Sequence, residues 1–213
     1  MKKFVLIFAF CFFSLTVHAQ DFKVNQETKN AVYILEKLNI LPSEFELSLN
    51  ATRLEYLTML MKIDDIDSSE FPDLGIVNDI MLKYDDTRNL NSNELRVLAE
   101  ADMKGILKGK MSNGKFFAAP DSDIIWREAL IFSLRVIMNV ERYYESDDQQ
   151  IVNIARNYNL IDYNFDEDDV LWLDEAVTNN ELCVLAYRLL HAPARINSAG
   201  GEYTKYYIDD FIK

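Results

Sequence analysis

The chain has 213 residues, of which 49% are hydrophobic and 27% are charged, and its formal net charge at pH 7 is -13. This acidity excludes nonspecific binding to nucleic acid or to anionic lipid, because both require a basic face. The hydrophobic content is sufficient for a sizeable core in one compact domain or a few small units. Only six glycines and four prolines are present, which disfavours an all-β fold with many tight turns.

Residues 1-19 have the features of a secretory signal peptide. Lys2 and Lys3 precede the apolar run Phe4 to Leu15, and Val17-His18-Ala19 offers small residues for cleavage. The apolar run is too short for a transmembrane helix, and no later segment approaches the ~18 to 20 apolar residues that one needs. We therefore expect an exported chain without a transmembrane segment. It starts at Gln20 and, after the loss of two lysines, has a net charge of -15.

Apolar residues recur at helical spacing along the rest of the chain. The two clearest stripes consist of Val32, Leu35 and Leu38, and of Leu57, Leu60, Met61 and Ile63. After cleavage Cys183 is the only cysteine, so no intrachain disulfide can form, and its place in the apolar run 182-190 predicts a buried thiol. The sequence therefore predicts a mainly α protein.

Three predicted helices end in the same way, with an Asn or Gly followed by two aliphatic residues. The three segments are Leu38-Asn39-Ile40-Leu41, Lys104-Gly105-Ile106-Leu107 and Tyr158-Asn159-Leu160-Ile161. Asn and Gly tolerate the left-handed conformation that ends many helices, and the aliphatic residues then fold back onto the helix. An aliphatic or small residue stands four positions earlier in each case, which predicts three equivalent helix ends.

Three further helices share a pattern at their start. Thr52 with Glu55, and Thr178 with Glu181, form capping boxes, in which the hydroxyl and the carboxylate each bind a backbone N–H group. In a third copy of this pattern, Ile125 stands in the cap position, Trp126 in the next position and Glu128 in the position of the Glu. Each Glu precedes a basic residue by seven positions, and two helical turns place both on one face. The three basic residues are Lys62, Arg135 and Arg188.

The order of helix, left-handed stop, loop, cap and second helix thus occurs three times, which predicts three tandem helix-loop-helix repeats. The expected boundaries are residues 20-66, 67-141 and 142-195, followed by a tail at 196-213.

These residues resemble the surface-layer homology (SLH) domain family. Its pattern runs Phe-x-Asp, a helix, Gly-Ile, a Gly-rich loop with Phe and Pro, and then Thr-Arg-x-Glu at the start of a second helix with a base near its end. The central repeat matches it with Phe71-Pro72-Asp73, Gly105-Ile106-Leu107-Lys108-Gly109, Gly114, Phe117, Pro120 and the run from Ile125 to Arg135. The three repeats cover about residues 25 to 195.

The resemblance implies a pseudo-threefold, three-pronged spindle in which the second helices bundle at the centre. It also implies grooves that bind cell-wall polysaccharide, often a polymer with an acidic ketal-pyruvyl group. The chain would then be an exported, non-catalytic module, without a cofactor, that attaches non-covalently to the cell wall and is found at the cell surface.

The contact residue that carries over from the family is the Arg of Thr-Arg-x-Glu. Here Arg53 holds that position, while Trp126 and Asn179 stand in the other two. The resemblance therefore implies glycan binding by Arg53, with stacking or amide hydrogen bonds from Trp126 and Asn179. Lys108 and Lys110 in the Gly-rich loop are further candidates for an anionic glycan. The structural alternatives are a solvated Arg53 and a Trp126 that serves packing.

A second function stays open, a degenerate repeat scaffold that binds another exported protein. Two of the three repeats lack the Arg, and a charge of -15 would repel an anionic polymer at long range.

Other site chemistries have little support in the sequence. Asp162 to Asp166 begins like a calcium loop, but Glu167 and Leu173 replace the Gly and the Glu that such a loop needs. Loose calcium binding by the acidic loop stays open. His191 and Cys183 make neither a zinc set nor a nucleophile with its base. We therefore predict no enzyme and no metal site.

Overall fold

The computed structural model describes residues 25-42, 45-64, 74-138, 147-162, 170-195 and 203-205, and they are mainly helical, as predicted. The α-helices are α1 (Gln26–Lys37), α2 (Arg53–Asp64), α3 (Leu74–Lys83), α4 (Ser92–Met103), α5 (Trp126–Met138), α6 (Asp148–Asn157) and α7 (Asn179–His191). The predicted signal peptide, the Phe71-Pro72-Asp73 motif and most of the acidic loop and tail lie outside these residues. Within them, no helix is long and apolar enough to cross a membrane.

The remaining elements are short. Strands β1 (Lys110–Ser112) and β2 (Lys115–Phe117) pair in an antiparallel hairpin, and β3 (Pro193–Arg195) pairs with β4 (Tyr203–Lys205) in the same sense. A 3-10 helix, η2 (Leu171–Asp174), precedes α7. The two-residue turn of the first hairpin is Asn113-Gly114, with φ of 51° and 75°. Positive φ at both positions suits the twist of a hairpin, which explains this residue pair.

The three predicted helix stops are confirmed. Asn39, Gly105 and Asn159 follow the ends of α1, α4 and α6 with φ of 57°, 71° and 56°. In each case the next N–H group donates to a carbonyl five residues back, in the pairs Ile40–Leu35 (2.8 Å), Ile106–Ala101 (2.8 Å) and Leu160–Ala155 (2.9 Å). This bond satisfies a carbonyl that the helix end would leave without a partner.

Both predicted capping boxes are also confirmed. The N–H of Thr52 donates to Glu55 Oε2 (2.7 Å), and the N–H of Glu55 donates to Thr52 Oγ1 (3.2 Å). Thr178 and Glu181 exchange the same two bonds at the start of α7, at 2.8 Å and 3.4 Å. Helix α5 begins at Trp126 after Ile125, which has no side-chain acceptor. Polar caps therefore begin α2 and α7, whereas α5 starts without one at Ile125.

The basic residues of the second helices contact the helix stops. Their side chains donate to the carbonyl that follows the left-handed residue, in the pairs Lys62 Nζ–Ile40 O (3.3 Å), Arg135 Nη1–Ile106 O (2.6 Å) and Arg188 Nη1–Leu160 O (3.5 Å). The base seven residues after each Glu thus ties one end of each second helix to the end of the helix before it.

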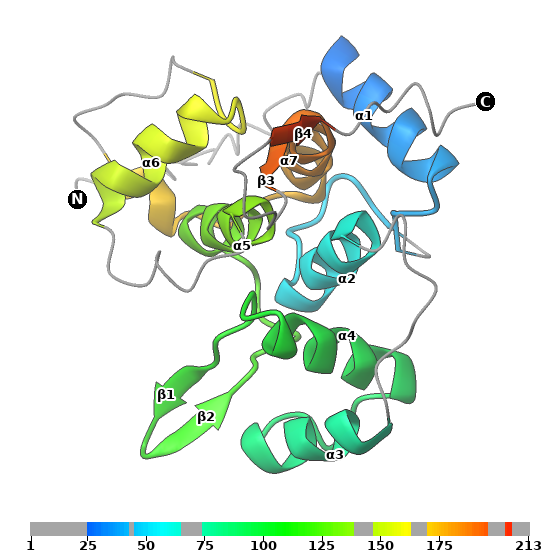
Figure 1. The fold of residues 1–213 in the computed structure, drawn as a ribbon, viewed down its shortest axis with the longest axis vertical. Coiled ribbons are helices and arrows are strands. Elements are labelled where there is room, and N and C mark those ends of the chain that lie inside the picture. The colour runs from blue at the N-terminus through cyan, green and yellow to red at the C-terminus, as the bar shows by residue number, and fades with distance from the viewer. Residues whose placement is uncertain are drawn as a thin grey trace, which may run out of the picture.

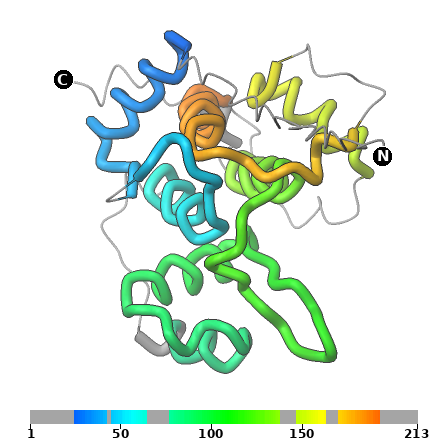
Figure 2. Tube along the Cα trace, turned by 180° about the vertical axis from the view of Figure 1, so that it is seen from behind, coloured from blue at the N-terminus to red at the C-terminus, as the bar shows by residue number. Residues whose placement is uncertain are grey.

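The segments that precede α2, α5 and α7 are joined by a closed ring of three backbone hydrogen bonds. The N–H of Ala51 donates to Val177 O (2.8 Å), the N–H of Val177 to Ile124 O (2.9 Å), and the N–H of Ile124 to Ala51 O (2.9 Å). All three side chains are fully buried. Figure 2 shows the three segments converging between the helices. We call this feature the central ring.

Around the central ring, α2, α5 and α7 contact one another pairwise. Leu60, Leu134 and Leu185, one from each of these helices, are buried. The main contacts of α1, α4 and α6 are with α7, α2 and α5 respectively, so each packs on a helix other than the next one in the chain. In Figure 1, α3 lies on the far side of α4, and the β1–β2 hairpin stands beside them in the lower part of the molecule.

We expect Asn159→Ala to lower the free energy of unfolding by about 1 kcal/mol, because alanine pays the cost of the left-handed conformation. Asn159→Gly should retain full stability. Urea denaturation monitored by circular dichroism measures both. Asn157→Ala, at an exposed position two residues earlier in α6, is the matched control and should change little. Equal stability of all three variants would contradict this account of the helix end.

Candidate functional site

Arg53 is buried between α2 and α5 instead of being a solvated charge. Only 1% of its surface is exposed. Its Nε donates to Ala118 O (3.0 Å), its Nη1 lies 2.7 Å from Glu128 Oε1, and its guanidinium lies 5.2 Å from the centre of the Phe132 ring. These contacts join the start of α2 to α5 and to the segment after the hairpin. Arg53 therefore contributes to packing.

The carboxylate of Glu128 also forms an ion pair with a lysine of the hairpin. Lys110 Nζ, at the start of β1, lies 2.7 Å from the same Oε1 atom of Glu128. Nη2 of Arg53 and Oε2 of Glu128 are buried without a hydrogen-bond partner among the described residues. Two of the five predicted glycan-binding residues, Arg53 and Lys110, thus meet at the carboxylate of Glu128. This carboxylate neutralises one of their two positive charges.

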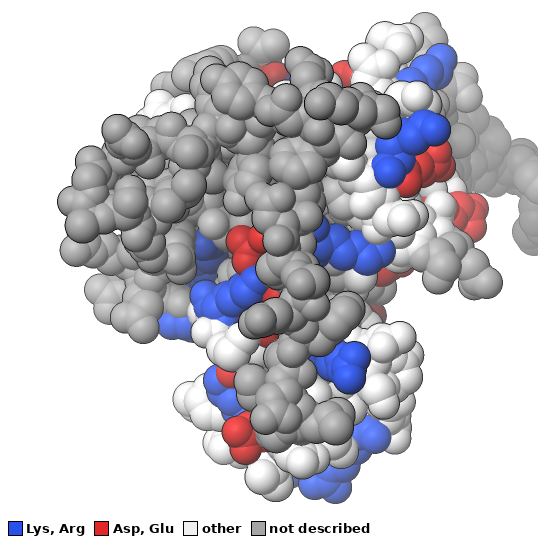
Figure 3. All heavy atoms as spheres, turned by 45° about the vertical axis from the view of Figure 1, so that its right-hand side comes forward, with Lys and Arg blue, Asp and Glu red and all other residues white. Residues whose placement is uncertain are grey.

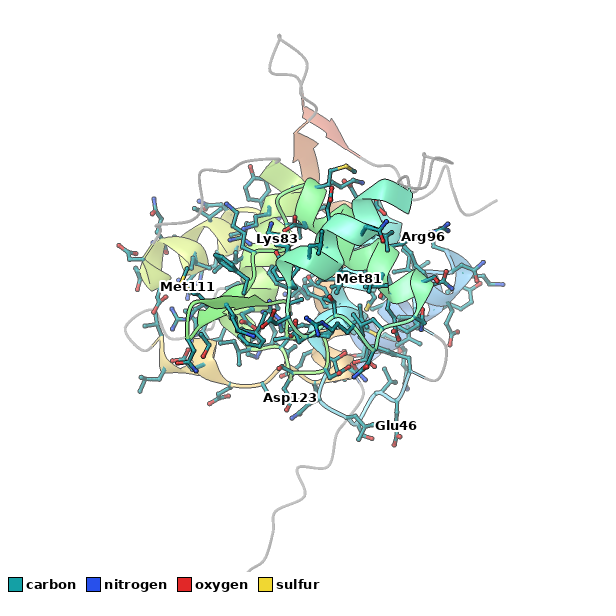
Figure 4. The ribbon with its side chains drawn as sticks, turned by 90° about the horizontal axis from the view of Figure 1, so that it is seen from below. Glu46, Met81, Lys83, Arg96, Met111 and Asp123 are labelled. Atoms are coloured by element: carbon teal, nitrogen blue, oxygen red, sulfur yellow. The ribbon has the colours of Figure 1, made fainter. Side chains whose placement is uncertain are left out.

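Asn179 is also buried, with 2% of its surface exposed. Its Nδ2 donates to Glu46 O (2.9 Å), which fixes the loop before α2. Figure 4 shows Glu46 and Asp123 on loops at the same side of the molecule, where Asp123 Oδ2 accepts a bond from Asn50 Nδ2 (2.8 Å). The amide of Asn179 therefore joins the start of α7 to the loop before α2. Lys108 is exposed after the stop at Gly105.

The three residues that the family pattern aligns occupy the same backbone position. The N–H group of each residue donates to a backbone carbonyl of a neighbouring segment, and the residue with this carbonyl stands two positions before a residue of the central ring. The pairs are Arg53–Ser122 (3.0 Å), Trp126–Glu175 (3.0 Å) and Asn179–Leu49 (2.8 Å). The backbone contact is common to the three positions, whereas the side chains differ. Of the three, only Trp126 is partly exposed.

Trp126 lines a pocket of about 180 Å³. The edge of its ring meets Trp172 of η2, with the ring centres 5.8 Å apart and an angle of 75° between the planes. The other walls come from the starts of α1 and α7 and from the segment after α6. The polar side chains among them are Asn25, Glu27, Thr28, Asp162, Asn180, Glu181 and Arg188. We call this the Trp126 pocket.

Arg188 is the single base among the described residues that line the Trp126 pocket, and two carboxylates hold it. Glu27 binds its Nε (2.7 Å) and its Nη2 (2.9 Å), and Asp162 lies 3.0 Å from Nη2. The hydrogen bond that Arg188 donates to Glu27 is the main reason why the pKa of Arg188 is raised, and its bond to Asp162 adds to it. The guanidinium is therefore fixed in the wall with its donors engaged.

Sequence reasoning did not identify Glu27 and Asp162 as pocket residues. Glu27 lies 161 positions from Arg188, so no local pattern links them. Asp162 was named only as the first residue of a calcium-like loop. Its place three residues after the stop at Asn159 matches that of Lys108 after Gly105, and this match is a signal that could have marked it.

Cys183 and His191 do not form a catalytic pair. Cys183 is buried, and desolvation raises the pKa of its thiol to about 12, while His191 is exposed with Nδ1 2.8 Å from Tyr187 O. A protonated, buried thiol is a poor nucleophile. Among the described residues, no group of three His, Cys, Asp or Glu side chains is placed to hold a metal ion.

No known family model matches the chain, and a search of curated proteins found no match either.

We expect Arg53→Ala to lower the free energy of unfolding by about 3 kcal/mol, because it leaves a largely buried carboxylate with one exposed partner. Urea denaturation measures this loss. Arg127→Ala is the matched control, since Arg127 pairs with Asp148 and Asp174 at the surface, and it should cost under about 1 kcal/mol. An Arg53→Ala protein as stable as the control would contradict the buried role.

We expect the thiol of Cys183 to resist labelling by a disulfide reagent in the native chain from Gln20 onward, and to react at once in urea. Burial holds its pKa near 12, whereas an unfolded thiol ionises near pH ~8.5. Its contribution to stability is therefore full below pH ~8.5 and falls as the pH rises toward the folded value. Ser112→Cys, at an exposed hairpin position, is the reactive control. Rapid native labelling of Cys183 would show that the thiol is accessible.

Proposed function

We propose that this protein is an exported, non-catalytic binding module of the cell envelope that attaches to cell-wall polysaccharide through the Trp126 pocket. The observation that carries the proposal is the central ring, which gives Arg53, Trp126 and Asn179 the same backbone position while leaving Trp126 open at a pocket. An aromatic ring beside a few polar groups in a concave site is the usual composition of a small-ligand site.

The proposed architecture is a three-pronged spindle with three helix-loop-helix repeats about a pseudo-threefold axis. Three recurring features support it: the stops at Asn39, Gly105 and Asn159, the base that contacts each stop, and the cyclic bonding of the central ring. The outer helices α1, α4 and α6 would be the prongs, each packed on the central helix of another repeat.

The glycan site is proposed at Trp126 because its neighbours in the pattern are engaged elsewhere. Arg53 and Asn179 are buried and support the loops, and Lys110 is paired with Glu128. The pocket volume of about 180 Å³ suits one sugar ring of a longer polymer. Trp126 would supply a flat face for that ring, and Asn180 at the start of α7 would supply polar contacts.

We expect Trp126→Ala to weaken wall binding about 10-fold, because truncation of an aromatic anchor typically costs more than 1 kcal/mol. The assay is sedimentation of the protein with purified walls, before and after removal of their non-peptidoglycan polymer. Tyr33→Ala is the matched control, since Tyr33 is an aromatic residue of α1 with 55% of its surface exposed. The proposal would be contradicted if the wild type bound walls equally before and after removal of the polymer, and if Trp126→Ala bound them as well as the wild type does.

A second candidate function is a repeat scaffold that binds another exported protein. Its support is a set of exposed apolar side chains in α3, α4 and the hairpin, namely Met81, Leu82, Met103, Met111 and Phe116. Figure 4 shows Met81 on α3 and Met111 on the hairpin. Exposed apolar groups of this kind occur at protein interfaces, and Met adapts to varied partners. Failure of the wall assay together with loss of partner binding in Leu82→Ser would favour this function.

A further inference from the structure

We infer that the Trp126 pocket selects a sugar unit with a free, protonated amino group, rather than an acidic or a fully acetylated one. This inference rests on the proposed function and names its ligand class. The inferred ligand is cationic, whereas the family resemblance implied an acidic polymer. The difference follows from the charges in the pocket wall.

The first step is the balance of charge. Three carboxylates, Glu27, Asp162 and Glu181, and one guanidinium, Arg188, line the pocket. The wall therefore has an excess of negative charge. An incoming carboxylate or pyruvyl group would meet like charges, whereas an ammonium group would be attracted.

The second step is that the one cation is already used. Glu27 binds Arg188 through two donors and Asp162 binds Nη2. An anionic sugar would have to displace one of these carboxylates to reach the guanidinium. A cation needs no displacement, since each carboxylate has acceptor sites that Arg188 leaves free.

The third step concerns the helix starts, which act against this balance of charge because they attract anions. The N-terminal ends of α1 and α7 both reach the pocket, and such ends favour anions. Here one N–H group of each start has a partner within the chain: Asn25 Oδ1 accepts from the N–H of Thr28 (2.8 Å), and Thr178 Oγ1 accepts from the N–H of Glu181 (3.4 Å). Each first turn also carries its own carboxylate, Glu27 or Glu181. These carboxylates offset the positive potential of the helix starts.

The fourth step is an unused acceptor. Oδ1 of Asn180, a pocket residue, is buried without a hydrogen-bond partner among the described residues. The negative end of this amide dipole adds to the attraction of the pocket for an ammonium group. Trp126 lines the same pocket, and ammonium groups are attracted to the faces of such rings.

The charge of the whole protein acts in the same direction. A net charge of -13 attracts a cationic polymer and repels an anionic one at long range. On the face in Figure 3, some of the described Lys and Arg side chains lie next to Asp and Glu side chains.

The test is isothermal titration of the protein with three soluble trisaccharides at one mildly acidic pH. The probes are a glucosamine trimer, its fully N-acetylated form and a galacturonic acid trimer. We expect the glucosamine trimer to bind about 10-fold more tightly than the acetylated one, the lower end for a hydrogen bond to a charged group. The acidic trimer should bind most weakly. Added salt should weaken the glucosamine complex.

Two matched variants locate the effect. Asp162→Asn should weaken glucosamine binding about 3-fold, because it removes one pocket carboxylate. Asp174→Asn should not, although Asp174 is equally exposed, at 65% against 64%, and also binds an arginine.

Each alternative outcome overturns the inference. Equal binding of the amino and acetylated trimers, stronger binding of the acidic trimer, no binding of any trimer, or equal effects of the two variants would do so. If the wall assay succeeds while the glucosamine trimer fails, the inference alone is wrong. If the wall assay also fails, the proposed function is wrong with it.

Discussion

The arrangement of the described helices depends on the central ring. Its three hydrogen bonds join residues 51, 124 and 177, which are far apart in the sequence, and each residue both donates and accepts. Because the three side chains are buried, no water is present to replace a broken bond, so each bond is costly to lose. The ring fixes where α2, α5 and α7 start, and these starts in turn fix where the outer helices pack.

One backbone position occurs three times beside the ring, and its side chain decides what each copy does. Arg53 is neutralised by Glu128 and joins α2 to α5, and Asn179 holds the loop before α2. Trp126 instead borders a pocket with Trp172 behind it. A common backbone frame therefore does not imply three equal grooves. The binding site is expected where the side chain is large, flat and partly exposed.

Much of the fold was predicted from the sequence because its signals are local. The stops at Asn39, Gly105 and Asn159, and the caps at Thr52 and Thr178, depend on hydrogen bonds within one turn, so residue type and spacing are sufficient to find them. The choice of packing partner for α1, α4 and α6 was not predicted. That choice depends on the shape of buried surfaces, which no short pattern encodes.

The candidate site shows the same division. Of the pocket residues, the sequence by itself named Trp126 as a binding candidate, whereas it named Glu181 only as a helix cap and Arg188 only as the base that follows this cap. Only the tertiary structure decided that Arg53 is buried and that Glu27 reaches Arg188. Burial and charge pairing depend on which distant segments meet, and the energy of a charge depends on its surroundings more than on its type. For this reason the sequence determined the helices and their ends, while the tertiary structure decided which of the predicted residues a ligand can reach.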